Sequence, residues 1–422
     1  MIGEPVYRKL VLDNGLRVVT ERMPALKSVT VGIWVNVGSR DEGTGEEGLS
    51  HFLEHMFFKG TASRSATQIS REIDALGGEL NAFTSRETTT FYVKVLDQHI
   101  EPAVALLADI FRESRFAPKE VEKEKQVVLE EIRMVQDDPE DLVQELHTEQ
   151  AMKRHPLGRS ILGCVQTIQG LRRTHLLRYV RTHYHPQQTV VAVAGSFNLA
   201  ELTPLLEKSF GTFTQPGAPR HHRWPSDVHG GLVVRKKALE QAHLCLGLPG
   251  VALAHKDRYG AYALNVLLGG GVSSRLFQEV RERRGLAYSI YSYLSSYSDS
   301  GTFTIYAATR PREAARVVEL VRREIRRIRT KGVGRDELER TKNQMKGNLM
   351  LSLEHSSSRM SKLAKDELHQ GEPTSLEEML IEIDRVSGEH LLRLSRDLFD
   401  LNRLSVTALG PVSQTSLQSA LD

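Results

Sequence analysis

Apolar and polar residues alternate at the start of the chain, and this alternation predicts β-strands. In residues 9–23 (KLVLDNGLRVVTERM), Asn14 and Gly15 stand between two apolar runs. An Asn-Gly pair in this setting is a strong β-hairpin signal, because both residues accept the positive φ of a tight turn. Residues 28–42 (SVTVGIWVNVGSRDE) continue the alternation, so we expect another strand there.

Segments with helical periodicity are interspersed with further strands. Residues 79–96 predict two strands with a turn near Ser85 and Arg86, and residues 189–195 (TVVAVAG) predict a buried strand. We expect helices over about 47–58, 66–78 and 101–114, and a long charged helix from about residue 118.

Residues 212–229 (TFTQPGAPRHHRWPSDVH) interrupt the pattern with three prolines and little periodicity. We interpret this segment as a linker between domains. After it the pattern starts over: Ser405–Gly410 repeats Val190–Gly195, and the helical stretch 336–351 repeats 119–134. The offset of roughly 210–217 residues indicates an internal duplication.

The duplication predicts two homologous domains, 1–211 and 230–422. In each half strands are followed by helices and then by strands, which favours an α+β fold. We expect each domain to be a mainly antiparallel sheet with helices on one face. We further expect the two domains to face each other and to enclose a cavity.

Composition and charge are those of an ordinary soluble protein. The 422 residues are 40% hydrophobic and 26% charged, and the net charge is +3. This near balance gives no indication of a charged surface that would bind nucleic acid or a membrane. Without an apolar run of about 18 residues, a signal peptide or a transit pattern, a cytoplasmic location is expected. Cys164 and Cys245 lie in apolar stretches, and we expect them to be isolated buried thiols.

The segment His51-Phe52-Leu53-Glu54-His55 carries the clearest chemistry. On a helix, residues i and i+4 lie on one face, so His51 and His55 could grip one metal ion. Glu54 leans toward the same side and could deprotonate a water on that ion. Zinc suits such a site, because it accepts imidazole nitrogen and carboxylate oxygen and keeps one position open for catalysis. A polar stripe on a surface helix is the alternative.

The two histidines need a third ligand. The charged helix from Pro118 offers Glu124, Glu130 and Glu131, among other acidic residues. Glu124 and Glu131 are separated by two helical turns and share a half-apolar face. Periodicity alone does not choose among the three, and a solvated helix face is again the alternative.

Longer segments resemble a known family. The sequence resembles the pitrilysin-type inverzincins, which are zinc metallopeptidases with an HxxEH motif. The segments that carry the resemblance are GLSHFLEHMFFKGT, GGELNAFTSRETTTFY, EKQVVLEEIRM, YHPQQTVVAVAG and SSRLFQEVRERRGLAYSIYS. The resemblance covers nearly the whole chain and points to the short branch that includes bacterial processing proteases and the β subunit of mitochondrial processing peptidase. It implies a zinc-dependent endopeptidase that hydrolyses extended or unfolded peptides, in peptide degradation or processing.

The resemblance also assigns roles at the metal. The family pattern places the third zinc ligand at Glu131 and a supporting glutamate at Glu124. One Zn²⁺ per chain would then be bound by His51, His55 and Glu131. Glu54 would activate a zinc-bound water as general base and later pass the proton to the leaving amine.

The second half of the chain lacks these groups. Residues 261–265 (AYALN) align with the HFLEH segment, and Asn348 aligns with Glu131. The metal-free domain would instead contribute Arg281 and Tyr288, because the family has an Arg and a Tyr at this spacing that reach the substrate. Tyr288 can donate a hydrogen bond to the developing oxyanion, and Arg281 can hold the substrate backbone.

The strand that contains Asn81, Ala82 and Phe83 is the other candidate for substrate binding. In the family this strand lies at a sheet edge beside the metal. An extended peptide can add to such an edge through backbone hydrogen bonds, while side-chain pockets tune preference. An ordinary hairpin is the alternative.

The expected partners are a peptide substrate and a second copy of the chain, since short members of the family often work as pairs. Pairing with a related inactive subunit is the alternative. Two other functions stay open. One is a non-catalytic structural subunit like the core proteins of the respiratory complex, and metal content tests it. The other is a zinc hydrolase that acts on something other than peptides, and product analysis tests it.

Overall fold

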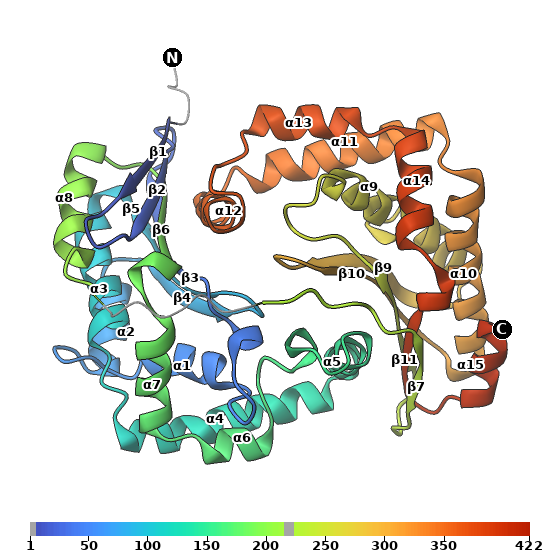
Figure 1. Ribbon diagram of the computed structural model, residues 1–422, viewed down its shortest axis with the longest axis horizontal. Coiled ribbons are helices and arrows are strands. Elements are labelled where there is room, and N and C mark those ends of the chain that lie inside the picture. Colours follow the sequence, from blue (N-terminus) through green and yellow to red (C-terminus); the bar gives the residue numbers. More distant parts are fainter. Residues whose placement is uncertain (1–5, 215–222) are drawn as a thin grey trace. The chain divides into compact units, whose positions relative to one another are not determined.

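The computed structural model describes residues 6–214 and 223–422 (Figure 1). Of the predicted linker 212–229, residues 215–222 lie outside this described part. No helix among the described residues is both long and apolar enough to cross a membrane.

The chain forms two compact units, each assembled from separate stretches. Among the described residues, the first unit is made of residues 6–133, 159–214 and 352–373, and the second of residues 134–158, 223–351 and 374–422. The units therefore differ from the expected halves 1–211 and 230–422, because each half gives one segment to the other unit.

The first unit contains a six-stranded sheet in the order β1-β2-β6-β3-β5-β4. Its strands are β1 (Val6–Val11), β2 (Arg17–Arg22), β3 (Ser28–Val35), β4 (Glu79–Thr84), β5 (Thr89–Leu96) and β6 (Thr189–Gly195). β1 and β2 form the hairpin predicted around Asn14 and Gly15. β2 and β6 run parallel, and the other neighbours are antiparallel. β1 and β4 are the two edge strands.

Most helices of the first unit pack on one face of this sheet. They are α1 (Leu49–Phe57), α2 (Ala66–Ala75), α3 (Ile100–Glu113), α4 (Pro118–Asp137), α6 (Val165–Gly170), α7 (Arg173–His183) and α8 (Leu199–Phe210). Only the part of α4 up to Arg133 belongs to the first unit. The large apolar core lies between this layer and the sheet, where Val31, Ile33 and Phe91 meet Phe52 and Phe57 of α1. Burial of these side chains is the main force that fixes α1 on the sheet.

The other face of the sheet carries one helix, α12 (Ser356–His369), which the sequence analysis did not anticipate. Trp34 of β3 is fully buried beneath it and donates a hydrogen bond from Nε1 to Sδ of Met360 at 3.1 Å. Thr30 and Ser356 share a buried hydrogen bond of 2.8 Å. A Cβ on Gly32 would lie 2.4 Å from Sδ of Met360, so glycine lets the helix approach this strand closely.

The second unit contains a five-stranded sheet in the order β7-β11-β8-β10-β9. Its strands are β7 (Gly231–Arg235), β8 (Ala242–Pro249), β9 (Ala287–Ser296), β10 (Gly301–Thr309) and β11 (Ser405–Leu409). β7 and β11 run parallel, and the remaining pairs are antiparallel. This order repeats β2-β6-β3-β5-β4 of the first unit, as expected for a duplicated domain.

The helices of the second unit follow the same plan. They are α5 (Pro139–Ala151), α9 (Arg258–Gly269), α10 (Ala314–Lys331), α11 (Arg335–Ser352), α13 (Leu376–Arg385), α14 (Gly388–Leu398) and α15 (Gln414–Leu421). The last residue of α11, Ser352, belongs to the first unit. α5 packs on β8 and β11. There His147 is fully buried, with its Nδ1 3.2 Å from Oγ1 of Thr407. Helices α5 and α12 follow the repeated helices α4 and α11, and each completes the sheet of the other half's unit.

Two sheet-plus-helix units confirm the two-domain α+β class that the pattern predicted. One expectation was wrong. Both cysteines are free, but only Cys245 is buried, whereas Cys164 is exposed. Cys164 precedes the short helix α6 as its N-cap, and a helix start at the surface leaves its side chain in solvent.

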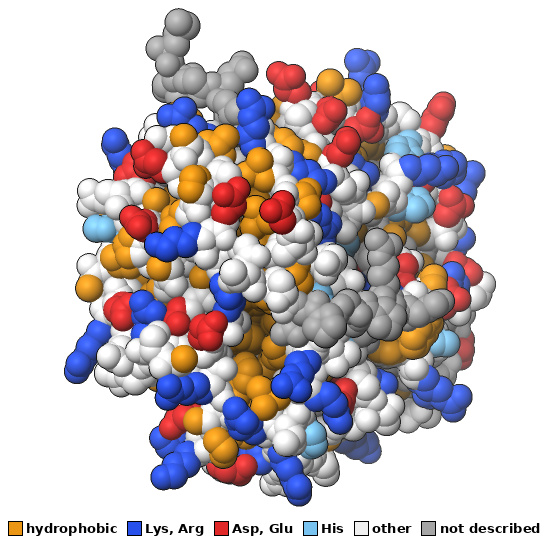
Figure 2. All heavy atoms as spheres, turned by 60° about the vertical axis from the view of Figure 1, so that its left-hand side comes forward, with side chains coloured by type: hydrophobic (Ala, Val, Ile, Leu, Met, Phe, Trp, Pro, Cys, Tyr) orange, Lys and Arg blue, Asp and Glu red, His pale blue; other side chains and the backbone are white. Residues whose placement is uncertain are grey.

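Acidic and basic side chains are interspersed on the face drawn in Figure 2, with apolar side chains between them. Neither sign of charge dominates this face, in keeping with the small net charge of +3.

Candidate metal centre

Helix α1 carries the HxxEH motif and is fixed at both its start and its inner face. Its apolar residues are buried as expected, namely Phe52, Leu53, Met56 and Phe57. The carboxylate of Glu42 accepts hydrogen bonds from the backbone N–H groups of Gly48 (2.9 Å) and Ser50 (2.7 Å), which caps the helix. Gly48 has φ 91°, and a Cβ there would lie 2.5 Å from the carbonyl oxygen of Leu162, so only glycine fits.

His51, His55 and Glu131 converge on one point. The Nε2 atoms of the two imidazoles are 3.2 Å apart. The carboxylate oxygens of Glu131, on α4, lie 3.6 Å from Nε2 of His51 and 3.6 Å from Nε2 of His55. One ligand atom from each residue lies within 4.8 Å of the others. The side chains are 13%, 19% and 33% exposed, so the cluster is open on one side.

Glu124 lies behind this cluster and touches it through His55. Its Oε1 accepts a hydrogen bond from Nδ1 of His55 at 2.8 Å, and its Oε2 accepts one from Nζ of Lys59 at 2.7 Å. Because an ionised carboxylate can only accept, Nδ1 of His55 carries the hydrogen. Its Nε2 then keeps a free lone pair toward the point of convergence, which is the tautomer that a metal ligand requires.

The same contacts set the charges of the site. Burial, together with the neighbouring His55, lowers the pKa of His51 to about 4, so this imidazole is neutral at pH 7. Burial also opposes the charged form of His55, but the hydrogen bond to Glu124 and the charges of Glu131 and Glu124 outweigh it and raise the pKa of His55. Burial acts against ionised Glu124, yet its bonds to His55 and Lys59 lower its pKa.

Glu54 is held by a residue of β4. Its Oε2 accepts a hydrogen bond from Oγ1 of Thr84 at 2.6 Å. Burial raises the pKa of Glu54, and the hydrogen bond from Thr84 and the charge of His55 only partly oppose this shift. A carboxylate with a raised pKa is a better proton acceptor near neutral pH than an ordinary glutamate.

The predicted substrate strand is the edge strand β4, and its side chains alternate between two faces. Ala82 packs against the core on the α1 side, where Thr84 also points. The side chains of Asn81 and Phe83 therefore point to the opposite face. Phe83 lies edge-on to Trp34 there, with ring centroids 5.4 Å apart, and is 38% exposed.

Arg281 and Tyr288 belong to the second unit and lie against each other. Arg281 is in a short π-helix, η5 (Phe277–Glu282), and Tyr288 is in β9. The guanidinium carbon of Arg281 is 4.6 Å from the ring centroid of Tyr288 and 4.7 Å from that of Phe277. Tyr288 is 77% exposed, so its hydroxyl is accessible to a ligand.

The donor set in the first unit fits zinc. Two imidazoles and one carboxylate are the ligands of many catalytic zinc sites, with a fourth position left for water or substrate. Of the acidic residues that periodicity left open, Glu130 points away, because it is 65% exposed and pairs with Arg133 on the helix surface.

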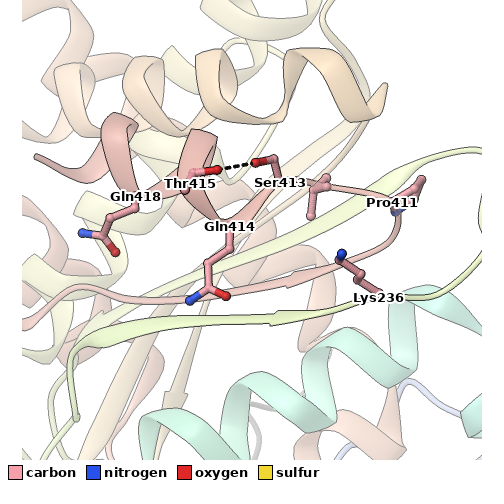
Figure 3. Close-up of a pocket in the computed structure, with 7 residues that line it drawn as sticks. Lys236, Pro411, Ser413, Gln414, Thr415 and Gln418 are labelled. Carbon is pink, nitrogen blue, oxygen red and sulfur yellow. Dashed lines mark hydrogen bonds between the residues drawn. The ribbon is translucent and has the colours of Figure 1, made fainter.

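A separate concavity in the second unit offers no such chemistry. It lies at the start of α15 and is lined by Lys236, Pro411, Val412, Ser413, Gln414, Thr415 and Gln418 (Figure 3). Ser413 and Thr415 hydrogen-bond each other at 2.8 Å. None of the lining side chains is an imidazole, thiol or carboxylate, so this pocket cannot hold a metal as the cluster in the first unit can.

Three contributors to the site were missed from the sequence: Thr84, Lys59 and Glu42. Strand alternation could have found Thr84, because it stands two residues after Ala82 and so shares its face. Lys59 is four residues after His55, a spacing of about one helical turn, although α1 itself ends at Phe57. The capping role of Glu42 had no local signal, because the residue lies in a loop well before the helix starts.

Family models match both halves of the chain. Insulinase (Peptidase family M16) matches residues 17–165, and the Peptidase M16 inactive domain matches residues 170–345. The chain is 43% identical over 394 residues to an uncharacterized zinc protease of Bacillus subtilis, covering 93% of this chain and 96% of the relative. It is 40% identical over 417 residues to an uncharacterized zinc protease of Streptomyces coelicolor, covering 97% of this chain and 91% of the relative.

Solved structures share the fold. A protease from Helicobacter pylori aligns with a TM-score of 0.91 at 24% identity, over 97% of this chain and 100% of that chain. A chain of Complex III2 from Candida albicans aligns with a TM-score of 0.84 at 21% identity, over 98% of this chain and 99% of that chain. At these identities the likeness concerns the fold alone.

The duplicated α+β fold, the convergent cluster on an HxxEH helix and these relatives together define a zinc metalloprotease. The chain belongs to the insulinase family, peptidase family M16. The resemblance that the sequence motifs suggested is thus confirmed.

Proposed function

We propose that this metalloprotease is an endopeptidase that hydrolyses extended or unfolded peptides, with one zinc ion per chain held by His51, His55 and Glu131. The observation that carries the proposal is the convergence of these three side chains on one point, next to the carboxylate of Glu54. A single such cluster is found among the described residues, which supports one ion per chain.

Zinc, when bound, lowers the pKa of a water toward ~7 and polarises the carbonyl that is attacked. In the proposed reaction Glu54 takes a proton from the attacking water and then delivers it to the nitrogen of the leaving amine. The raised pKa of Glu54 supports the first transfer, because it makes the carboxylate a stronger proton acceptor than an ordinary glutamate. Glu124 keeps His55 in the tautomer that binds metal.

The edge strand β4 supports an extended substrate. Its outer edge pairs with no other strand among the described residues, so a peptide strand could be added at this edge. Ala82 and Thr84 would face the substrate's reacting side, and Asn81 and Phe83 would meet side chains on the other face. We further propose that Arg281 and Tyr288 bind the substrate and that Tyr288 donates to the developing oxyanion.

The test combines zinc content with cleavage of an unstructured peptide, in wild type and in the variant Glu54→Gln. This change keeps the three ligands but removes the proton acceptor, so the variant should retain zinc and lose at least about 100-fold in kcat. Mass analysis of the products should show internal cleavage. A zinc-loaded wild type that cleaves no peptide would refute the proposal, as would a Glu54→Gln variant with wild-type activity.

A further inference from the structure

Thr84 donates a hydrogen bond from its side chain to the carboxylate of Glu54, and a backbone hydrogen bond from Thr84 acts on the same carboxylate. The distance from Oγ1 of Thr84 to Oε2 of Glu54 is 2.6 Å, which is the usual distance for a hydroxyl that donates to an ionised carboxylate. Thr84 is not part of the cluster that converges on the metal position.

Thr84 is the last residue of β4, and hydrogen bonds close the turn that follows it. Immediately after it, Ser85 and Thr88 bond each other through backbone and side chain, with the N–H of Ser85 2.8 Å from the carbonyl of Thr88 and the N–H of Thr88 2.9 Å from Oγ of Ser85. Thr89, which pairs with Thr84 across the hairpin, donates from Oγ1 to the carbonyl of Val37 at 2.9 Å.

A buried ion pair fixes the same turn from the other side. Arg40 and Glu87 are joined at 2.6 Å, and their side chains are only 2% and 6% exposed. The backbone N–H of Arg40 also donates to the carbonyl of Arg86 at 2.8 Å. The turn therefore cannot shift without breaking buried polar contacts, and Thr84 keeps its position relative to α1.

We propose that Thr84 is a positioning residue for the general base: it fixes one oxygen of Glu54 and so aims the other at the attacking water. This inference rests on the proposed function of Glu54. A carboxylate on a glutamate side chain has three rotatable bonds, and a displacement of about 1 Å at a reacting group can cost roughly 100-fold in rate. Because Thr84 stands on the edge strand proposed to receive the peptide, one strand would align both the substrate and the base.

The experiment compares kcat, KM and zinc content for wild type, Thr84→Val, Thr84→Ser and a matched control, Thr90→Val. Valine has nearly the shape of threonine but cannot donate, and serine restores the donor. Thr90 is buried in the neighbouring strand β5 and pairs with Phe83, and its hydroxyl has no hydrogen-bond partner among the described residues. Removing that hydroxyl tests the general effect of Thr→Val in this sheet.

We expect Thr84→Val to lower kcat by about 10- to 100-fold, with zinc content unchanged and KM within about twofold. Thr84→Ser should recover most of the loss, and Thr90→Val should behave as wild type. Three results would overturn the inference while Glu54→Gln remains inactive. The first is a wild-type kcat in Thr84→Val. The others are a loss of kcat that Thr84→Ser does not restore and a loss of kcat that parallels a loss of zinc. If zinc-loaded wild type does not cleave peptide at all, the proposed function fails and the inference fails with it.

Discussion

Replacing Glu124 by Gln should weaken zinc binding without removing a ligand. Glu124 is almost fully buried, and it accepts from Nδ1 of His55 at 2.8 Å and from Nζ of Lys59 at 2.7 Å. An amide keeps one acceptor oxygen for His55 but loses the negative charge that makes this imidazole a strong ligand. Removing such an outer partner typically costs 10- to 100-fold in metal affinity, or about 1.4–2.7 kcal/mol.

The assay is a zinc titration in competition with a chelator of known affinity, at fixed pH. Glu130→Gln is the matched control, because it makes the same change on the same helix at a side chain that is 65% exposed and pairs with Arg133. The reasoning is refuted if Glu124→Gln and Glu130→Gln bind zinc with the same Kd within about twofold, since the hydrogen bond to His55 would then contribute nothing.

Further predictions concern the third ligand, the packing of α12 and the response to pH. Glu131→Gln should lose stoichiometric zinc, whereas Glu130→Gln should keep it, as measured by metal analysis of purified protein; zinc retained by both variants would contradict the assignment. Met360→Ala empties a site that is 1% exposed and should lower the free energy of unfolding by about 2–5 kcal/mol, whereas Met350→Ala, at 52% exposure, should change it by less than about 0.5 kcal/mol; equal shifts in denaturant midpoint would contradict this. Burial lowers the pKa of His147 to about 4 from 6.5, so the unfolded chain binds more protons between these values. Stability from this residue is therefore present above pH 6.5 and is lost as pH falls toward 4, by up to about 3 kcal/mol, and His147→Asn should flatten the decline of Tm over this range; an unchanged slope would contradict it.

Local features of the sequence predicted much of the first unit. The Asn14-Gly15 turn, the strand pair on either side of Ser85 and the helix that carries HxxEH all depend on neighbours a few residues away, and the structure has them. The choice of third ligand was different. Glu130 and Glu131 are adjacent, and spacing could not tell which one points inward; burial and the pairing of Glu130 with Arg133 decide this only in the folded helix.

The exchange of α5 and α12 between the repeats was not predictable from pattern. The apolar part of the buried face of α12 is short, consisting of Met360, Leu363 and Ala364, and nothing local in that pattern says which sheet it covers. The partner of Trp34 lies over 300 residues further along the chain. Thr84, in contrast, was predictable, because alternation along β4 places its side chain on the same face as Ala82.

The reciprocal placement of α5 and α12 sets an order on folding during synthesis. The first sheet has all its strands once β6 is made, yet its second face stays uncovered until α12, ending at His369, leaves the ribosome. An N-terminal domain usually completes its fold while the rest of the chain is being made. In the nascent chain, Trp34 and its apolar neighbours therefore stay uncovered until α12 is made, and the second sheet is complete only after β11 (Ser405–Leu409) has followed.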